Sequence, residues 1–589
     1  MTWQGWFTLA VALVALALLI RETFSPANTL LGAVITLLFA RVLTPAEAFS
    51  GFANSAPITV AALYILARAV EVTGLMQPVL GWLLGGGRGA LWRLTAPTAA
   101  ASAFLNNTPL VAMLIPSVSD WAQRTGRSPS RFLMPLSFAA ILGGVITLIG
   151  TSTNLVVSGM LDARTGRPMG MFEITPIGLP VAIVGLAVMA ATVRWLLPDR
   201  SAARADLENE TSREFTFQMR VEIGGPLDGV TVEAARLRSL QGVYLIEIER
   251  HGQPIAPVSA ETLLRADDRL CFVGRVDQVF DVTTIRGLVS AEQSHLAPFD
   301  TARHRFFEAV VGASSPLVGQ TLKEATFRDR YQAAVVAIHR AGQRVNAKLG
   351  AVRLKVGDTL LVLGDPGFRD RWRDRGDFLL VAPLGGSPPS ITKKAWFVAA
   401  VLTMVVLVAG LGLLPMLEAS LGGVIALVAF GVLTAGEARR AIDLEVILMI
   451  GASFGLGAAM EKSGLADAVA GGLTGASSVL GPLGALLGVM LATLVATELI
   501  TNNAAAALLF PIAFSTAEHV GADPRLFGIV VAVTASASFL TPIGYQTNTM
   551  VYGPGGYRFV DYARLGTPLT VAVIITVLLI ARFWYGLGA

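Results

Sequence analysis

The stretch Leu105-Asn106-Asn107-Thr108-Pro109 places two asparagines, a threonine and a proline inside an otherwise apolar segment. A second stretch, Leu499-Ile500-Thr501-Asn502-Asn503, does the same toward the other end of the chain. Unpaired amides are costly in hydrocarbon, so polar groups at membrane depth must line a cavity or be buried in protein. The two stretches therefore predict the tips of re-entrant hairpins near residues 96–117 and 491–512.

The composition of the 589 residues is that of a membrane protein. Hydrophobic residues make up 53% and charged residues 15%, and the mean hydropathy is +0.63. Soluble globular proteins carry about 25% charged residues. More than half of the charged residues lie between Asp199 and Lys393, and long runs outside that stretch are nearly charge-free. The pattern excludes an ordinary soluble enzyme and predicts an α-helical polytopic protein with a soluble central insert.

Charge and cysteine content narrow the possible partners. A net charge of +4 over this length gives no reason to expect a nucleic-acid partner. Cys271 is the only cysteine, which excludes a disulfide framework and a thiolate metal site. No cofactor is expected. The first apolar run lacks a basic leading region and a cleavage motif, so we expect a retained helix there rather than a signal peptide.

The membrane part divides into two copies, residues 1–198 and 394–589. Val42-Leu43-Thr44 recurs as Val432-Leu433-Thr434, and Glu47-Ala48 recurs as Glu437-Ala438. Later in the copies, Asn107, Pro116, Gly150 and Asn154 are matched by Asn502, Pro511, Gly544 and Asn548. Apolar runs of spanning length lie near 6–20, 27–43, 54–70, 131–150, 175–197, 394–415, 420–436, 444–460, 525–543 and 567–587. Five crossings and one hairpin in each copy would invert one copy relative to the other, the plan of many secondary transporters.

The soluble insert is itself a tandem repeat, with one unit predicted at 205–290 and the other at 298–385. Leu264, Asp268, Leu270 and Gly274 recur 90 residues later as Leu354, Asp358, Leu360 and Gly364. Short alternating strands between Gly-rich turns predict small α+β units. The positive-inside rule places this insert in the cytoplasm and both chain ends outside.

The polar residues of the hairpins suit the binding of a cation together with an anion. Carbonyl and hydroxyl oxygens are ligands for Na⁺, whereas amide NH₂ groups, hydroxyl protons and the N-termini of broken helices suit an oxyanion. Gly150 and Gly544 permit close backbone approach at the two breaks. Neither cluster contains Lys or Arg, so a bound anion needs dipoles and co-bound cations.

Two points stay open on the residues alone. Asparagines within a membrane can also serve as hydrogen-bonding contacts between helices, although two equivalent pairs with matching breaks favour a site. Glu498 is the one acid in a hairpin, where its counterpart is Ala103. It would tune a cation site, take up a proton, or pair with backbone near a helix end.

These motifs resemble the divalent anion:sodium symporter family. The resemblance rests on Asn106-Asn107-Thr108, Gly150-Thr151-Ser152-Thr153-Asn154, Thr501-Asn502-Asn503 and Gly544-Tyr545-Gln546-Thr547-Asn548. It implies a homodimer with elevator-type transport and two Na⁺ sites. By position, one Na⁺ site would use Ser102, Asn106, Asn107 and Gly150, and the other Thr497, Ile500, Asn502 and Gly544. The substrate would contact Asn106, Asn107, Thr108, Thr151, Thr501, Asn502, Asn503, Tyr545 and Gln546.

The insert resembles two copies of the C-terminal module of potassium-uptake TrkA proteins, most clearly at Val335-Val336-Ala337-Ile338-His339-Arg340. That resemblance implies a small regulatory ligand such as a nucleotide, or a role limited to dimerisation. Members with such an insert are often named sulfate permeases, and the inner membrane is the expected location.

The departures from the family pattern predict the substrate. The usual Ser-Asn-Thr motifs are here Asn-Asn-Thr and Thr-Asn-Asn, and Tyr545 and Gln546 stand where proline-rich stretches are usual. Bulkier amides and a tyrosine would shrink the pocket, which favours sulfate over a four-carbon dicarboxylate. A proton-coupled or metal-oxyanion transporter is one alternative. An ion channel or K⁺ uptake subunit is another, but no Thr-Val-Gly-Tyr-Gly filter occurs in the sequence.

Overall fold

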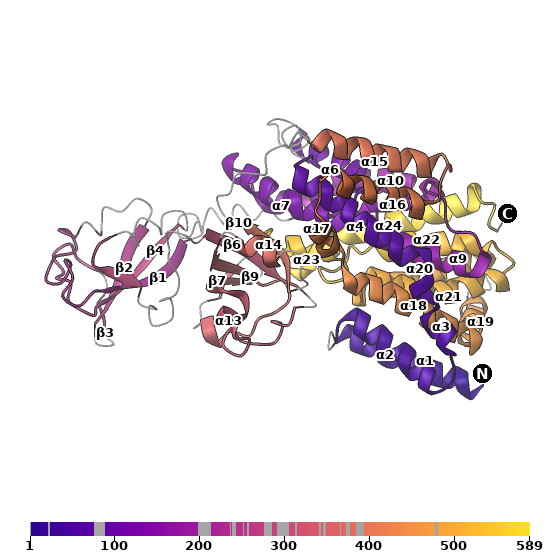
Figure 1. The fold of residues 1–589 in the computed structure, drawn as a ribbon, viewed down its shortest axis with the longest axis horizontal. Helices are drawn as coiled ribbons and strands as arrows, with labels where there is room; N and C mark the ends of the chain where they lie inside the picture. Colours follow the sequence, from indigo (N-terminus) through magenta and orange to yellow (C-terminus); the bar gives the residue numbers. More distant parts are fainter. Residues whose placement is uncertain are drawn as a thin grey trace.

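The computed structural model describes residues 2–21, 24–75, 89–197, 214–235, 237, 243–250, 253–255, 258–275, 285–290, 305–312, 315–340, 343–345, 349–365, 367–372, 377–383, 394–476 and 481–588. Six of the expected domain limits, at 1, 198, 205, 298, 385 and 589, lie outside these residues. The described chain consists of a helical body and a central insert of two strand-rich modules, which extend from one end of the body (Figure 1).

The helical body repeats its order of elements. The first copy contains α1 (Trp3–Ile20), α2 (Pro26–Phe39), α3 (Pro45–Phe49), η1 (Ser50–Ala53), α4 (Ser55–Thr73), α6 (Ala90–Ser102), α7 (Asn107–Arg124), η2 (Pro129–Arg131), α8 (Leu133–Gly144), α9 (Ser152–Thr165) and α10 (Thr175–Leu196). The second contains α15 (Ala395–Gly410), α16 (Met416–Ala429), α17 (Ala435–Ala441), α18 (Leu444–Lys462), α19 (Leu465–Ala476), α20 (Gly481–Leu499), α21 (Asn502–His519), α22 (Pro524–Ser536), α23 (Gln546–Tyr552) and α24 (Phe559–Phe583).

Local sequence starts equivalent helices in the same way. Thr44 and Glu47 form a capping box at the start of α3, and Thr434 and Glu437 form one at the start of α17. In each box the threonine hydroxyl accepts the N3 amide, and the glutamate accepts the threonine amide at 2.7 or 2.8 Å. These contacts satisfy donors that a helix start otherwise leaves unpaired.

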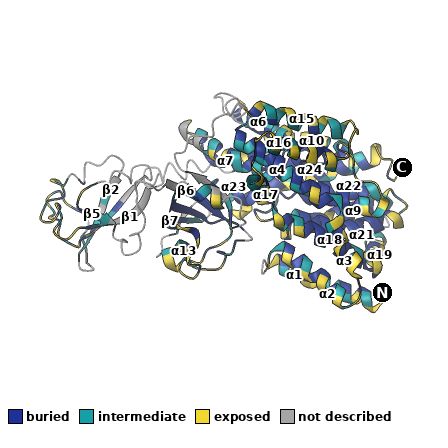
Figure 2. Cartoon of the chain, in the orientation of Figure 1, coloured by how far each residue is buried: buried dark blue, intermediate teal, exposed yellow. Residues whose placement is uncertain are grey.

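The two copies are interlocked. α18 of the second copy packs against α2 of the first, α16 packs against α4, and α10 packs against α24. One large apolar core extends through both copies. A second core joins α4 to α15, α16 and α17. Figure 2 shows the buried residues concentrated inside the helical body and many exposed residues along outer helices such as α1 and α2.

The outer surface of the helical body is apolar, as lipid contact requires. Trp6, Phe39, Trp195, Trp396 and Phe583 are all more than half exposed. Six helices in the described residues are long and apolar enough to span a membrane. Exposed apolar surface on this scale marks contact with a bilayer or another protein rather than water. The chain is therefore a multi-pass membrane protein.

Two of the runs expected to span are not continuous helices. α8 has 12 residues and ends at Gly144, and α22 has 13 residues and ends at Ser536. The chain then runs without helix to α9 and α23, respectively. Runs 131–150 and 525–543 thus each consist of a short helix and a broken segment, although their apolar composition is that of a span.

The insert contains two five-stranded antiparallel sheets with the same strand order. The first sheet is ordered β3-β2-β4-β1-β5 and the second β8-β7-β9-β6-β10, when both are read in the same direction. Their strands are β1 (Glu214–Val221), β2 (Val243–Arg250), β3 (Gln253–Ile255), β4 (Arg269–Arg275), β5 (Leu288–Ser290), β6 (Arg305–Val311), β7 (Ala333–Arg340), β8 (Gln343–Arg344), β9 (Thr359–Gly364) and β10 (Phe378–Pro383). The second module also has α13 (Phe327–Tyr331), η3 (Leu349–Ala351) and α14 (Phe368–Trp372).

Each module is held by the same buried ion pair. Arg340 donates from Nε and Nη2 to the two oxygens of Asp358 at 2.7 and 2.8 Å, and the amide of Lys355 also donates to Asp358 at 2.8 Å. Arg250 and Asp268 repeat this arrangement in the first module. Both carboxylates are almost fully buried. A buried carboxylate needs such partners because removing its charge from water is otherwise costly in free energy.

We expect Asp358→Ala to destabilise the second module by about 2 kcal/mol, because it leaves a partly buried guanidinium and an amide without their acceptor. Hydrogen–deuterium exchange of the intact protein should be faster over β6 to β9 and unchanged over β1 to β4. Asp268→Ala should give the opposite pattern, with faster exchange over β1 to β4 and unchanged exchange over β6 to β9. Equal effects on both modules from either substitution would contradict independent folding of the repeats.

Candidate functional site

Both hairpin tips lie at a gap between two helices. α6 ends at Ser102 and α7 begins at Asn107, whereas α20 ends at Leu499 and α21 begins at Asn502. The Thr501 hydroxyl caps α21 by accepting the amide of Ala504 at 3.4 Å. In the first tip, Asn106 Oδ1 accepts the amide of Thr108 at 3.4 Å. Each tip thus points the amide end of a long helix toward the gap.

Two repeat-equivalent asparagines hold the broken helices. Asn154 Nδ2 donates to the carbonyls of Gly144 and Thr147 at 3.0 and 2.8 Å. Asn548 Nδ2 donates to the carbonyls of Ser538 and Thr541 at 2.9 and 3.3 Å. In both copies a side-chain amide therefore satisfies carbonyls that the break releases from helical hydrogen bonding.

The first hairpin tip contacts the broken helix of the second copy. Asn107 Nδ2 donates to the Tyr545 hydroxyl at 2.5 Å, and the same hydroxyl lies 3.1 Å from Thr151 Oγ1. Thr108 Oγ1 donates to Gln546 Oε1 at 3.1 Å. Asn107, Thr151 and Tyr545 are buried, whereas Gln546 is exposed. Tyr545 thus joins residues that sequence spacing alone leaves unconnected.

The second hairpin tip contacts the broken helix of the first copy in turn. Asn502 Nδ2 donates to Thr153 Oγ1 at 2.8 Å. Asn503 Oδ1 accepts from Ser152 Oγ and Thr153 Oγ1, both at 3.0 Å. No role was predicted for Ser152 or Thr153, although both lie in the stretch from Gly150 to Asn154. Each tip therefore meets the break of the other copy, and the site forms where the copies join.

The arrangement brings the N-termini of α7, α9 and α21 to one region. Their first residues are Asn107, Ser152 and Asn502, which the contacts above connect through Tyr545, Thr151 and Thr153. Unpaired amides and the helix dipole make a helix N-terminus favourable for an anion. The tips and breaks contain no Lys or Arg. Any anion that binds here would therefore be attracted by dipoles and hydroxyls.

Oxygen atoms gather beside the first tip. Ser102 Oγ donates to Asn107 Oδ1, and both side chains are fully buried. Thr147 Oγ1 donates to the carbonyl of Ala103. A Cβ at Gly150 would collide with the carbonyl of Gly144, so only glycine allows this approach. Hydroxyl, amide and carbonyl oxygens in a buried cluster are suitable ligands for a small hard cation such as Na⁺.

The second tip is built similarly. A Cβ at Gly544 would lie 2.5 Å from the Thr497 carbonyl, and Thr497 Oγ1 donates to the Ala535 carbonyl at 2.5 Å. Ile500 is buried at the end of the hairpin. Asn502 uses its Nδ2 across the copies, so only its Oδ1 is available to a cation. Thr541 Oγ1 donates to the Glu498 carbonyl at 3.3 Å, which repeats the contact of Thr147 with Ala103.

Glu498 makes the two tips chemically unequal. Its Oε1 accepts the amide of Leu540 at 2.9 Å. Its Oε2 and the Ser538 hydroxyl are buried without a hydrogen-bond partner among the described residues. The equivalent positions in the first copy are Ala103 and Gly144. The second tip therefore has a carboxylate and a hydroxyl that the first tip lacks.

Comparison with known proteins identifies the family. Residues 11–534 match the family CitMHS, described as citrate transporter. The chain belongs to the citrate transporter family. It is also 36% identical to an uncharacterized transporter of Synechocystis, over 98% of this chain and 97% of that one. Members of this family are transporters, so the chain is a transporter and not an enzyme.

Several further relatives are named after the ions that they transport. Sodium/sulfate cotransporter 2 of Chlamydomonas reinhardtii is 26% identical, over 97% of this chain and 89% of that one. Among solved structures, the YdaH transporter of Alcanivorax borkumensis matches with a TM-score of 0.42 and 13% identity, over 94% of this chain and 89% of that one. This last likeness is too weak to place any residue of the site.

We expect Tyr545→Phe to raise the substrate concentration that gives half-maximal uptake by about tenfold. The substitution removes the hydroxyl that Asn107 and Thr151 share, and an unpaired buried amide costs about 1–3 kcal/mol. Uptake of labelled substrate into proteoliposomes measures the change. Tyr557→Phe is the matched control, because that buried hydroxyl bonds to Met134 and Ser130 instead. A similar shift in both variants would contradict a binding role for Tyr545.

Proposed function

We propose that this protein is a secondary transporter that couples Na⁺ to the uptake of a small divalent oxyanion, with sulfate the first candidate. One observation carries the proposal: three long helices start at a shared polar gap whose tips and breaks contain no cationic side chain. Relatives named sodium/sulfate cotransporters support the choice of ions.

The coupling follows from charge. An uncharged set of amides and hydroxyls can orient a dianion but cannot neutralise it, and burying an uncompensated charge is costly. The oxygen clusters at Ser102 and Asn107 and at Thr497 and Gly544 lie at the two tips that also contact the anion region. Na⁺ at these clusters would supply the missing positive charge, so each ion would strengthen the binding of the other.

Transport would proceed by an elevator-type movement of the hairpins and breaks past a fixed frame. The second apolar core, of α4, α15, α16 and α17, supports this division, and Leu105 of the first tip packs against it. Such a core can stay packed while the unit that contains the tips moves, because few polar contacts would have to be exchanged at an apolar boundary.

The orientation in the membrane follows from the positive residues. Figure 1 places both chain ends at the end of the helical body opposite the insert. Arg439 and Arg440 end α17, and Glu437 of the same helix interacts with Arg68 of α4. Arg369 of the insert lies 3.8 Å from Glu71 at the end of α4. We therefore propose that this cationic side and the insert face the cytoplasm, with the protein in the cell's inner membrane.

The insert would regulate transport through α23. The second module packs its turn at Gly357 and Thr359 against Tyr552 and Gly553, at the C-terminal end of α23. α23 has only seven residues, about 10 Å, and Tyr545 directly precedes it. A displacement of the module would thus reach the site through about two turns of helix. A small ligand on the TrkA-like modules, such as a nucleotide, would be the natural signal.

We expect proteoliposomes to accumulate labelled sulfate only with an inward Na⁺ gradient, and Asn107→Ala and Asn502→Ala each to reduce this uptake more than tenfold. Asn54→Ala is the matched control, because Asn54 caps α4 and bonds to the Gly159 carbonyl away from the tips. It should cost about 1 kcal/mol of stability and keep Na⁺-dependent uptake.

Three results would contradict the proposal in different ways. Accumulation of succinate or citrate instead of sulfate would change the substrate. Uptake driven by a proton gradient without Na⁺ would change the coupling ion. Single-channel currents from the reconstituted protein would replace the transporter by a channel.

We expect Gly553→Ala to change the half-saturating substrate concentration by threefold or more in the intact chain, because a Cβ there collides with the Thr359 side chain, 2.5 Å away. The same substitution in a chain lacking 205–385 should have no effect, since its partner is gone. Deletion of 205–290 alone should leave the effect in place. Equal effects with and without the insert would exclude coupling through this contact.

A further inference from the structure

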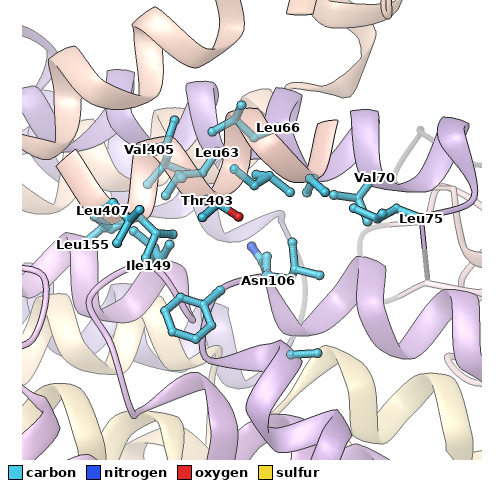
Figure 3. A pocket seen from close by; sticks show the side chains of 18 of the residues that line it. Leu63, Leu66, Val70, Leu75, Asn106, Ile149, Leu155, Thr403, Val405 and Leu407 are labelled. Carbon is cyan, nitrogen blue, oxygen red and sulfur yellow. The ribbon is translucent and has the colours of Figure 1, made fainter. Parts of the chain in front are cut away.

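A cavity of about 430 Å³ lies beside the first hairpin tip. Its walls come from α4, from the tip itself, from α9 and from α15. Figure 3 shows Leu63, Leu66 and Val405 around it, with Asn106 and Thr403 as polar side chains that reach toward the space. The residues that line the cavity in the described part of the chain are uncharged and mostly apolar. Ligand pockets in proteins are typically apolar spaces of about 300–1,000 Å³ with a few polar groups.

The cavity borders the proposed anion site. Asn106 and Ser152 line it, and the same residues belong to the first tip and to the start of α9. Ser152 Oγ also donates to Asn503 of the second tip. A ligand with its charged end among the tips can therefore extend its other end between α4 and α15 without leaving protein contact.

The lining decides what that other end can be. A bare sulfate ion gains nothing from apolar walls, because its charge requires hydrogen bonds or water. An alkyl group in the same space removes apolar surface from water and is favourable. The walls also lie between membrane-embedded helices, which supply no charged contact.

We propose that the cavity binds the apolar tail of an amphipathic organic anion whose sulfonate or sulfate head occupies the asparagine site. This inference rests on the proposed oxyanion site and extends its ligands from inorganic sulfate to organosulfonates and sulfate esters. Such ligands compete with sulfate, and their affinity increases with tail length until the cavity is full.

The test uses methane-, butane-, hexane- and octanesulfonate as inhibitors of Na⁺-dependent sulfate uptake into proteoliposomes. The concentration for half inhibition should fall about fourfold for each methylene that enters the cavity. Ala399→Leu narrows the cavity from α15, so the dependence on tail length should level off at a shorter tail while sulfate uptake persists. Ala400→Leu is the matched control: its position on α15 is exposed and does not line the cavity, so the dependence should remain.

Controls separate this inference from the function on which it rests. Thr403→Trp narrows the cavity from a second position on α15 and serves if Ala399→Leu folds poorly. Sulfate uptake without any tail-length dependence, or equal dependence in Ala399→Leu and Ala400→Leu, overturns the inference and leaves the proposed function intact. If wild type takes up no sulfate, the proposed function fails. In that case the unfolding temperature of nanodisc-embedded protein, measured with the same sulfonates, tests whether the cavity binds the tail. Of the two variants, Ala400→Leu should keep a stabilisation that grows with tail length, and in Ala399→Leu that growth should level off at a shorter tail.

Discussion

The contact of each hairpin tip with the broken helix of the other copy is the constraint on which the rest of the structure depends. Asn107 bonds to Tyr545 in one direction, and Asn503 bonds to Ser152 and Thr153 in the other. Neither copy can form the site alone, since each supplies a tip that needs the partner's break. The interlocked packing of α2 with α18 and of α4 with α16 brings these parts into register.

The close contacts behind each tip explain why the segments after α8 and α22 stay non-helical. The carbonyls freed at the ends of α8 and α22 are bonded by Asn154 and Asn548, so these buried acceptors are satisfied without a continuous helix. Glycine at Gly150 and Gly544 lets backbone meet backbone there. The cost of the non-helical segments is offset by side-chain amides, which is how irregular backbone persists at membrane depth.

Much of this plan could be predicted from the sequence, because it depends on repeats and on residue type. The helical membrane class and the transporter assignment are confirmed, and the gaps at Asn107 and Asn502 lie within the predicted hairpins. Breaks were predicted at Gly150 and Gly544, but the helices end earlier, at Gly144 and Ser536, because apolar composition does not distinguish a helix from a buried break. The pairing of Asn107 with Tyr545 could not be predicted, since it depends on how two distant segments pack. Coupling to Na⁺, sulfate as the substrate, the homodimer and a small ligand on the TrkA-like modules stay predictions.

The inequality of the copies has a physical consequence for coupling. A symmetric pair of neutral oxygen clusters would bind two equivalent cations, and the dianion between them would feel the same field from each side. Glu498 places a carboxylate near only the second tip, where Oε2 and the Ser538 hydroxyl have no partner among the described residues. Under the proposed Na⁺ coupling, a cation there would compensate the carboxylate, when it is ionised, as well as the substrate. The cluster at Ser102 and Asn107 contains no such charge, so a cation bound there depends more strongly on the anion. The two proposed cation sites would therefore fill in a defined order, the second copy's first.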